Sequence, residues 1–244
     1  SSYRPFYLWL VGFYLVWSLV VISGNYYQEV VDHWQIAVTM LFGSYVAGST
    51  PMGGGTVGFP ILVLVLDLPA TLGRNFGLAI QSIGMVSASI FVLCSRQPIA
   101  YSILRPALIG SLIGTPVGAA FIAPQISDLA IKLTFAVIWA SFGLMLFFNV
   151  KEMSRNTAGV QRPKPGHTLL GFLVGMAGGM VASIIGVGID MLVFAALVLR
   201  YQADLRVAIP TSVLLMAATS VTGIVSYLIL ARISPAHAVS SELF

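Results

Sequence analysis

Residues 51–56 read PMGGGT and interrupt an otherwise apolar run over residues 35–68, in which Asp67 is the only charged residue. A second glycine break, Gly186-Val187-Gly188, lies in another long apolar run, with Gly188 133 residues after Gly55. Paired breaks in the hydrophobic segments of two halves of one chain are typical of secondary transporters, whose substrate sites lie at the breaks. The pair therefore predicts a membrane carrier with two related halves.

The composition indicates an integral membrane protein. Hydrophobic residues make up 58% of the 244 residues and charged residues 8%, whereas soluble domains carry about 25% charged residues. The bases behind the net charge of +4 lie in short loops, which is a membrane-orientation signal and not a nucleic-acid-binding stripe. Cys94 is the single cysteine, so we expect neither an internal disulfide nor a cysteine metal cluster.

The apolar segments predict an all-α membrane fold. Residues 6–22 are interpreted as a retained transmembrane helix, because no signal-peptide cleavage pattern accompanies them. The remaining runs are either long enough for one crossing or, where glycines interrupt them, broken. We expect further crossings at about 74–95, 105–123, 129–149 and 207–231, and broken segments at 35–68 and 168–199.

The distribution of loop charges indicates that the first broken segment is re-entrant. As one helix it would be about 50 Å long, far more than the roughly 30 Å hydrocarbon core. If it enters and leaves on one side, Arg4, the 96–105 loop and the basic 151–167 linker share the cytoplasmic side. Glu29 and Asp32 then lie outside, in agreement with the positive-inside rule.

The number of crossings between the two breaks predicts inverted repeats, each opening with a broken, re-entrant helical hairpin. Three crossings separate them, so the second hairpin would enter from the opposite side. We expect the second repeat to lack its last two helices. The expected divisions are an N-terminal helix with its external loop (1–34), a first repeat (35–150), a basic cytoplasmic linker (151–167) and a second repeat (168–244).

The glycine breaks are the first candidate substrate-binding elements. Unwound backbone at membrane depth is tolerated only where it faces protein or a wet cavity, and glycine lets amide N–H groups approach an anion directly. We therefore expect a small oxyanion at the breaks. The alternative is a packing break that only lets helices approach closely. The residues concerned are Gly53, Gly54, Gly55, Thr56, Gly186 and Gly188.

Asp190 is the strongest single candidate, because no other charged residue lies within nine positions of it. A carboxylate at membrane depth costs at least about 2.5–3.5 kcal/mol on insertion scales, so such residues are by default functional. Binding a proton removes that cost. We therefore predict that Asp190 couples proton movement to transport.

Further polar residues follow each break. Arg74 and Asn75 are expected to open the next helix, with Gln81 two turns further on the same face. Arg74 either clamps an oxyanion or snorkels to the interface. Thr211 and Ser212 either bind substrate or bond back to their own helix.

Other motifs give no support to an enzyme. No H-E-x-x-H, G-x-S-x-G or P-loop pattern occurs, and the three histidines are not spaced as metal ligands. Gly110-x3-Gly114-x3-Gly118 predicts close helix packing. Neither a catalytic residue nor a metal or cofactor is predicted.

Two stretches resemble the TauE/SafE sulfite exporter family, also called the four-toluene-sulfonate uptake permease family. They are GSYVAGSTPMGGGTVGFPILVL (43–64) with DLPATLGRN (67–75), and GFLVGMAGGMVASIIGVGIDML (171–192) with PTSVLL (210–215). The resemblance covers roughly residues 35–231. It implies a secondary transporter for sulfite, sulfonates or related small anions in the bacterial inner membrane. The family usually has two more C-terminal helices.

The combined prediction is an alternating-access carrier, more probably an exporter than an importer, for a small sulfur-containing anion, with a proton as its coupling ion. The implied partners are the anion, the proton and the lipid bilayer, with no nucleic acid. A homodimer, the choice of anion and the coupling ion stay open. The alternatives are an anion channel and a membrane scaffold or sensor that binds without transporting.

Overall fold

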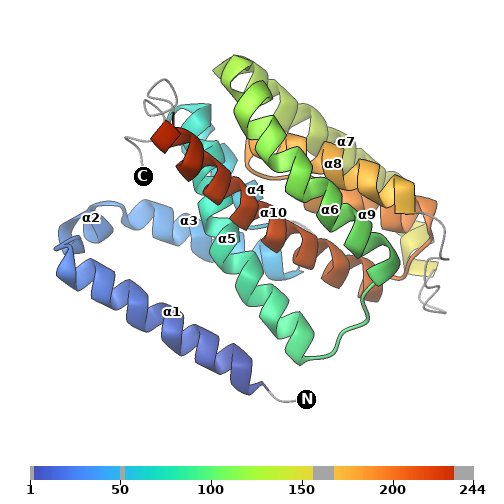
Figure 1. Ribbon diagram of the computed structural model, residues 1–244, viewed down its shortest axis with the longest axis horizontal. Helices are drawn as coiled ribbons and strands as arrows, with labels where there is room; N and C mark the ends of the chain where they lie inside the picture. Colours follow the sequence, from blue (N-terminus) through green and yellow to red (C-terminus); the bar gives the residue numbers. More distant parts are fainter. Residues whose placement is uncertain (1–2, 50–52, 156–167, 234–244) are drawn as a thin grey trace.

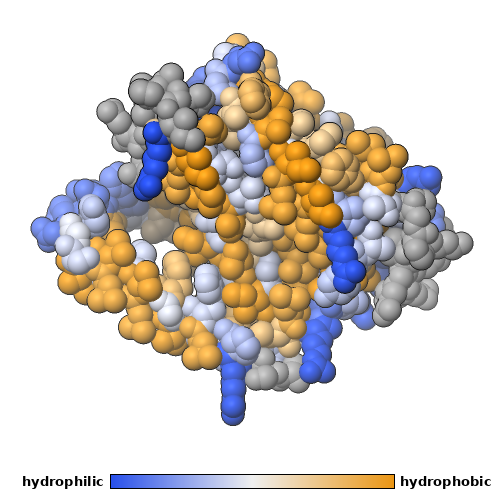
Figure 2. Space-filling view, viewed as in Figure 1, coloured by the Kyte–Doolittle hydropathy of each residue, from blue (hydrophilic) through white to orange (hydrophobic). Residues whose placement is uncertain are grey.

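The computed structural model describes residues 3–49, 53–155 and 168–233, and every regular element in these ranges is helical (Figure 1). Six helices in the described ranges are long and apolar enough to cross a membrane. They are Arg4–Ser23, Ala70–Cys94, Tyr101–Gln125, Asp128–Asn149, Thr168–Ile185 and Leu205–Arg232. Apolar residues cover most of the face seen in Figure 2, as a surface in contact with lipid requires. The predicted all-α membrane fold is confirmed.

Helix α1 (Arg4–Ser23) lies at one edge of the molecule and packs along α5 (Ala70–Cys94) (Figure 1). The Nε1 of Trp9 donates to the hydroxyl of Ser87 on α5 at 2.7 Å. The ring of Phe6 lies 5.4 Å from that of Phe91. A short helix, α2 (Tyr27–Asp32), then leads to α3 (Trp34–Ser49).

The first broken segment is a hairpin made by α3 and α4 (Gly55–Pro60), with α4 continued by a π-helical turn at Ile61–Val65. Gly43 of α3 lies against the carbonyl oxygen of Gly54, and Met40, one turn earlier, lies against Gly58. The chain therefore turns back on itself at the break.

The second broken segment has the same construction. Helix α8 (Thr168–Ile185) is followed by α9 (Ile189–Ala195) and a π-helical turn at Ala196–Arg200. Gly188 lies against Val181 of α8, and Ile189 packs onto Gly178, three residues before Val181. This segment also turns back on itself.

The two hairpins end alike. Asp67 and Gln202, 135 residues apart, both have positive φ, at 52° and 47°. The amide N–H of Leu68 bonds the carbonyl of Leu62 at 3.0 Å, and Ala203 bonds Leu197 in the same way. At this end the equivalent positions are 135 residues apart, two more than the offset of 133 that the sequence alignment indicates.

Helices α6 (Tyr101–Val117) and α8 make contact through two glycine stripes. On α6 the glycines face α8 backbone: a Cβ on Gly114 would meet the carbonyl oxygen of Met176. On α8 a Cβ on Gly175 would meet the carbonyl oxygen of Ala107. The predicted packing role of the stripe is confirmed. Its members are Gly110, Gly114 and Gly118 on α6 and Gly171, Gly175 and Gly179 on α8.

Helix α7 (Asp128–Arg155) supports the first hairpin. The ring of Phe59 in α4 stacks on Phe135 at 4.5 Å between centroids, and Phe135 contacts Trp139 at 5.5 Å. At the start of α7, the carboxylate of Asp128 accepts a 2.8 Å bond from the amide of Ala70, the first residue of α5. The carboxylate thereby caps α5, because the first turn of a helix has unsatisfied N–H groups.

Two predicted boundaries differ from the structure. Helix α7 continues to Arg155, so the first part of the expected linker is helical, and residues 156–167 lie outside the described ranges. Helix α5 starts at Ala70, so Arg74 and Asn75 lie in its second turn and do not open it. Pro69, which precedes Ala70, fixes an extended conformation that starts the helix earlier than the polar pair suggests.

Candidate functional site

The first break is a buried run of glycines. Gly53, Gly54 and Gly55 are all buried, and so is Thr56, whose hydroxyl donates to the carbonyl oxygen of Gly53. A Cβ on Gly53 or Gly55 would meet the amide nitrogen of Gln81. Glycine is therefore required here by close approach of α5. Pro51 and Met52, which belong to the predicted motif, lie outside the described residues.

The second break depends on glycine for its conformation. Gly186 has φ +81° and Gly188 has φ +112°, both in the left-handed region that L side chains rarely adopt. A Cβ on Gly186 would meet the carbonyl oxygen of Arg74. The break therefore rests directly on the backbone of α5.

The two breaks meet in the interior. The amide N–H of Gly53 donates to Oδ2 of Asp190 at 2.9 Å, across 137 residues of sequence. A Cβ on Gly55 would lie 2.9 Å from the side chain of Val187. Asp190 is fully buried, and its Oδ1 accepts a 3.0 Å bond from the amide of Met191. An amide of the first break thus holds the protein's own carboxylate.

One face of α5 serves as the platform for both breaks. Gly77 lies against the carbonyl of Gly186, next to the contact between Gly186 and Arg74. One turn further, Gln81 and then Met85 lie against Gly53. The spacing of three to four residues puts these positions on one side of the helix. The structure therefore brings Arg74, Gln81 and both glycine breaks together.

Arg74 is a buried cation without an acidic partner. It is 4% exposed, and its Nε donates to Oδ1 of Asn75 at 3.1 Å. Its guanidinium carbon lies 4.5 Å from the centroid of the Tyr227 ring, and the Tyr227 hydroxyl donates to the carbonyl of Ser183 at 2.6 Å. Among the described residues no carboxylate forms an ion pair with Arg74. The contacts place its guanidinium inside the protein, which disfavours the snorkelling interpretation.

Gln81 is a buried amide without a hydrogen-bond partner. It is 1% exposed, and neither Nε2 nor Oε1 has a partner among the described residues. A buried amide of this kind costs roughly 1–3 kcal/mol. The side chain is therefore available to a ligand or to water.

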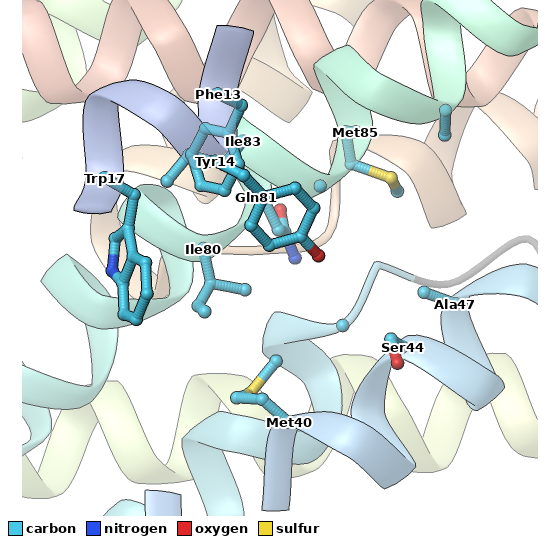
Figure 3. Close-up of a pocket in the computed structure, with 13 residues that line it drawn as sticks. Phe13, Tyr14, Trp17, Met40, Ser44, Ala47, Ile80, Gln81, Ile83 and Met85 are labelled. Carbon is cyan, nitrogen blue, oxygen red and sulfur yellow. The ribbon is translucent and has the colours of Figure 1, made fainter. Parts of the chain in front are cut away.

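Gln81 and Gly54 line a pocket of about 600 Å³ between α1, α3 and α5 (Figure 3). Three aromatic side chains of α1 form one wall. Figure 2 shows a hollow beside α1 in the same region. The lining residues are Phe13, Tyr14, Trp17, Met40, Ser44, Ala47, Gly54, Ile80, Gln81, Ile83, Gly84, Met85 and Ala88.

Thr211 and Ser212 have structural partners. The Thr211 hydroxyl donates to the carbonyl of Val207 at 2.6 Å and accepts a bond from the amide of Ala100, at the start of α6. The Ser212 hydroxyl donates to the carbonyl of Ile209 at 2.9 Å. These bonds match the alternative of back-bonding to the helix, and none of them reaches a glycine break.

Sequence reasoning did not single out Tyr227, Asp128 or the aromatic side chains of α1 that wall the pocket. A lone phenol in an apolar helix was the available signal for Tyr227. Within the described ranges, no group of three His, Cys, Asp or Glu side chains could hold a metal ion.

The strain at the second break gives a testable prediction. Gly186→Ala should lower the unfolding free energy by about 2 kcal/mol or more, because the methyl group needs both a disfavoured φ and space held by Arg74 backbone. Thermal unfolding in detergent measures the change. Gly143→Ala is the control, since a Cβ there meets nothing within 4 Å. Equal melting temperatures for the two variants would contradict the strain argument.

Comparison with known proteins agrees with this architecture. A family model described as sulfite exporter TauE/SafE matches residues 36–243, which include both hairpins and the helices between them. No curated protein and no solved structure matches the chain. Since the matched region covers most of the chain, the protein belongs to the sulfite exporter TauE/SafE family.

Proposed function

We propose that this membrane protein is a secondary transporter that exports small sulfur-containing anions, such as sulfite or organic sulfonates, by alternating access. Family membership supports membrane export of an anion of this kind. Two broken hairpins that meet inside the protein are the arrangement in which carriers bind their solutes. A transporter needs no catalytic group, and we assign none.

Arg74 is the observation that carries the proposal. A buried guanidinium without a carboxylate is costly in a membrane, and an anionic ligand would relieve that cost. Arginine forms bidentate bonds with oxyanions. We therefore propose that the anion binds between Arg74 and the breaks. The proposed site comprises Gly53, Gly54, Gly55, Thr56, Arg74, Asn75, Gln81, Gly186 and Gly188, with Asp190 as the proton-coupling residue.

We also propose that the hairpins begin two inverted repeats, at residues 35–150 and 168–244. The support is the shared order of break, short helix, π-helical turn and positive-φ residue. Positive loop charges favour an inner-membrane orientation with the N-terminus and residues 151–167 in the cytoplasm.

The proposal is tested by thermal-shift screening of the purified protein against sulfite, thiosulfate, sulfonates and small carboxylates, followed by flux in liposomes. A carrier shows saturable flux and counterflow of labelled anion against preloaded anion. Flux without counterflow would favour an anion channel. Binding without flux would favour a scaffold or sensor.

The pocket predicts a preference for anions with an apolar group. Its volume of about 600 Å³ exceeds what sulfite needs, and most of its lining is apolar. Gly84→Phe should weaken binding of an aryl sulfonate by about tenfold and leave sulfite affinity nearly unchanged, because the new ring fills the pocket away from Arg74. Isothermal titration measures both affinities.

Gly143→Phe is the matched control for the pocket. Gly84 and Gly143 are both exposed, and a Cβ on either meets nothing within 4 Å, but only Gly84 lines the pocket. If both phenylalanine variants weaken the aryl sulfonate equally, or if neither does, the pocket does not hold the organic group.

A further inference from the structure

The Asp190 carboxylate occupies the position where an anion would otherwise bind the first break. It accepts the Gly53 amide at 2.9 Å and is fully buried. Its further bonds come from backbone amides of Met191, Gly188 and its own residue. An amide N–H that holds this carboxylate is not free to hold a second anion.

Other charged groups do not compensate Asp190. The only described titratable side chains identified around the breaks are Arg74 on α5 and Tyr227 on α10, and these two contact each other. Arg74 interacts electrostatically with Tyr227 and Asp128, and Asp190 has only backbone partners. The segments 53–60, 181–189 and 191–199 contain no charged residue. The negative charge of Asp190 is therefore balanced by dipoles alone.

A substrate anion at the same breaks would face this charge in a dry interior, where like charges repel strongly. Repulsion falls when the carboxyl takes up a proton, and the neutral acid also releases its claim on the Gly53 amide. By linkage, whatever makes the anion bind better when Asp190 is protonated makes Asp190 bind a proton better when the anion is present.

We infer that the substrate anion and a proton on Asp190 bind together, so that the carrier moves them in the same direction. The inference rests on the proposed anion site. One proton per anion makes transport of a monovalent sulfonate electroneutral. A divalent sulfite then carries one net negative charge, which an inside-negative membrane potential drives outward.

Methanesulfonate is the probe that tests this inference, because it stays ionised at all working pH values and any pH dependence must come from the protein. Its dissociation constant should rise by up to tenfold per pH unit above the range in which Asp190 titrates. Calorimetry in buffers of different ionisation enthalpy should show uptake of up to one proton per bound anion. Asp190→Asn keeps an acceptor for Gly53 and should remove both effects.

Asp204→Asn is the matched control. Asp204 is a buried carboxylate, 6% exposed, that accepts the amide of Arg206 at the start of α10 and has no printed contact with either break. This variant should keep the wild-type pH profile. In liposomes, an acidic exterior should accumulate methanesulfonate inside for wild type and Asp204→Asn, whereas Asp190→Asn should only equilibrate it.

The outcomes separate this inference from the proposed function. Affinity that does not vary with pH, or proton release on binding, would overturn co-binding while leaving an anion carrier. Loss of the pH profile in both Asp variants would also overturn the assignment to Asp190. Failure of wild type to bind methanesulfonate at any pH, together with failure to bind sulfite, would overturn the proposed function as well.

Discussion

Arg74→Gln is expected to weaken sulfite and sulfonate binding by about 100-fold or more. The guanidinium would contribute two charge-assisted hydrogen bonds in a buried site, each worth roughly 1.5–3 kcal/mol. Glutamine keeps part of the side-chain volume but has no charge. Isothermal titration of the purified variant measures the affinity, and counterflow in liposomes measures the corresponding loss of transport. Arg74→Lys should give an intermediate loss, because lysine keeps the charge without the planar fork.

Arg105 provides the control for the loss of a cation–aromatic pair. Its guanidinium carbon lies 5.8 Å from the centroid of the Tyr101 ring, but the residue is exposed. Arg105→Gln should therefore leave anion affinity within about twofold of wild type, since exposed pairs contribute little. If Arg74→Gln binds as tightly as Arg105→Gln, the anion site is elsewhere.

Gly114→Leu is expected to prevent formation of a stable protein. The glycine faces the carbonyl oxygen of Met176, and a leucine there would force α6 away from α8 along the whole glycine stripe. Overpacking of a close helix contact costs several kcal/mol where backbone cannot yield. The expected result is aggregated protein in size-exclusion chromatography, or a melting temperature lowered by at least about 10 °C.

The same substitution at Gly12 of α1 tests whether leucine alone causes the loss. A Cβ at Gly12 meets nothing within 4 Å, so Gly12→Leu should elute and melt as the wild type does. A stable, monodisperse Gly114→Leu variant would show that α6 and α8 tolerate separation.

Most of the fold could be predicted from the sequence because lipid imposes strong rules. Apolar length indicates the crossings, and the unwound PMGGGT and GVG segments require protein around them. Helix ends were harder to predict. Helix α5 begins at Ala70 because Pro69 and the distant carboxylate of Asp128 set its start, and α7 extends to Arg155. Residue pairs so far apart give no local pattern.

The site was partly predictable. Arg74, Gln81 and Asp190 are exceptional in apolar surroundings, and all three lie at the breaks. The sequence could not show that Gly53 bonds Asp190, since that contact depends on how two hairpins dock. Nor could it show that Thr211 supports α6, because a membrane threonine looks the same whether it binds solute or backbone.

The stack of Phe59, Phe135 and Trp139 bears on how such a carrier would change shape. Flat rings can shear past one another with little change in dispersion energy and no polar bond to break. The short arm of the first hairpin thus rests on α7 as on a sliding bearing, whereas the backbone contact between α6 and α8 behaves as a clamped joint. Rocking of the first hairpin along that bearing is the low-cost displacement that this architecture offers.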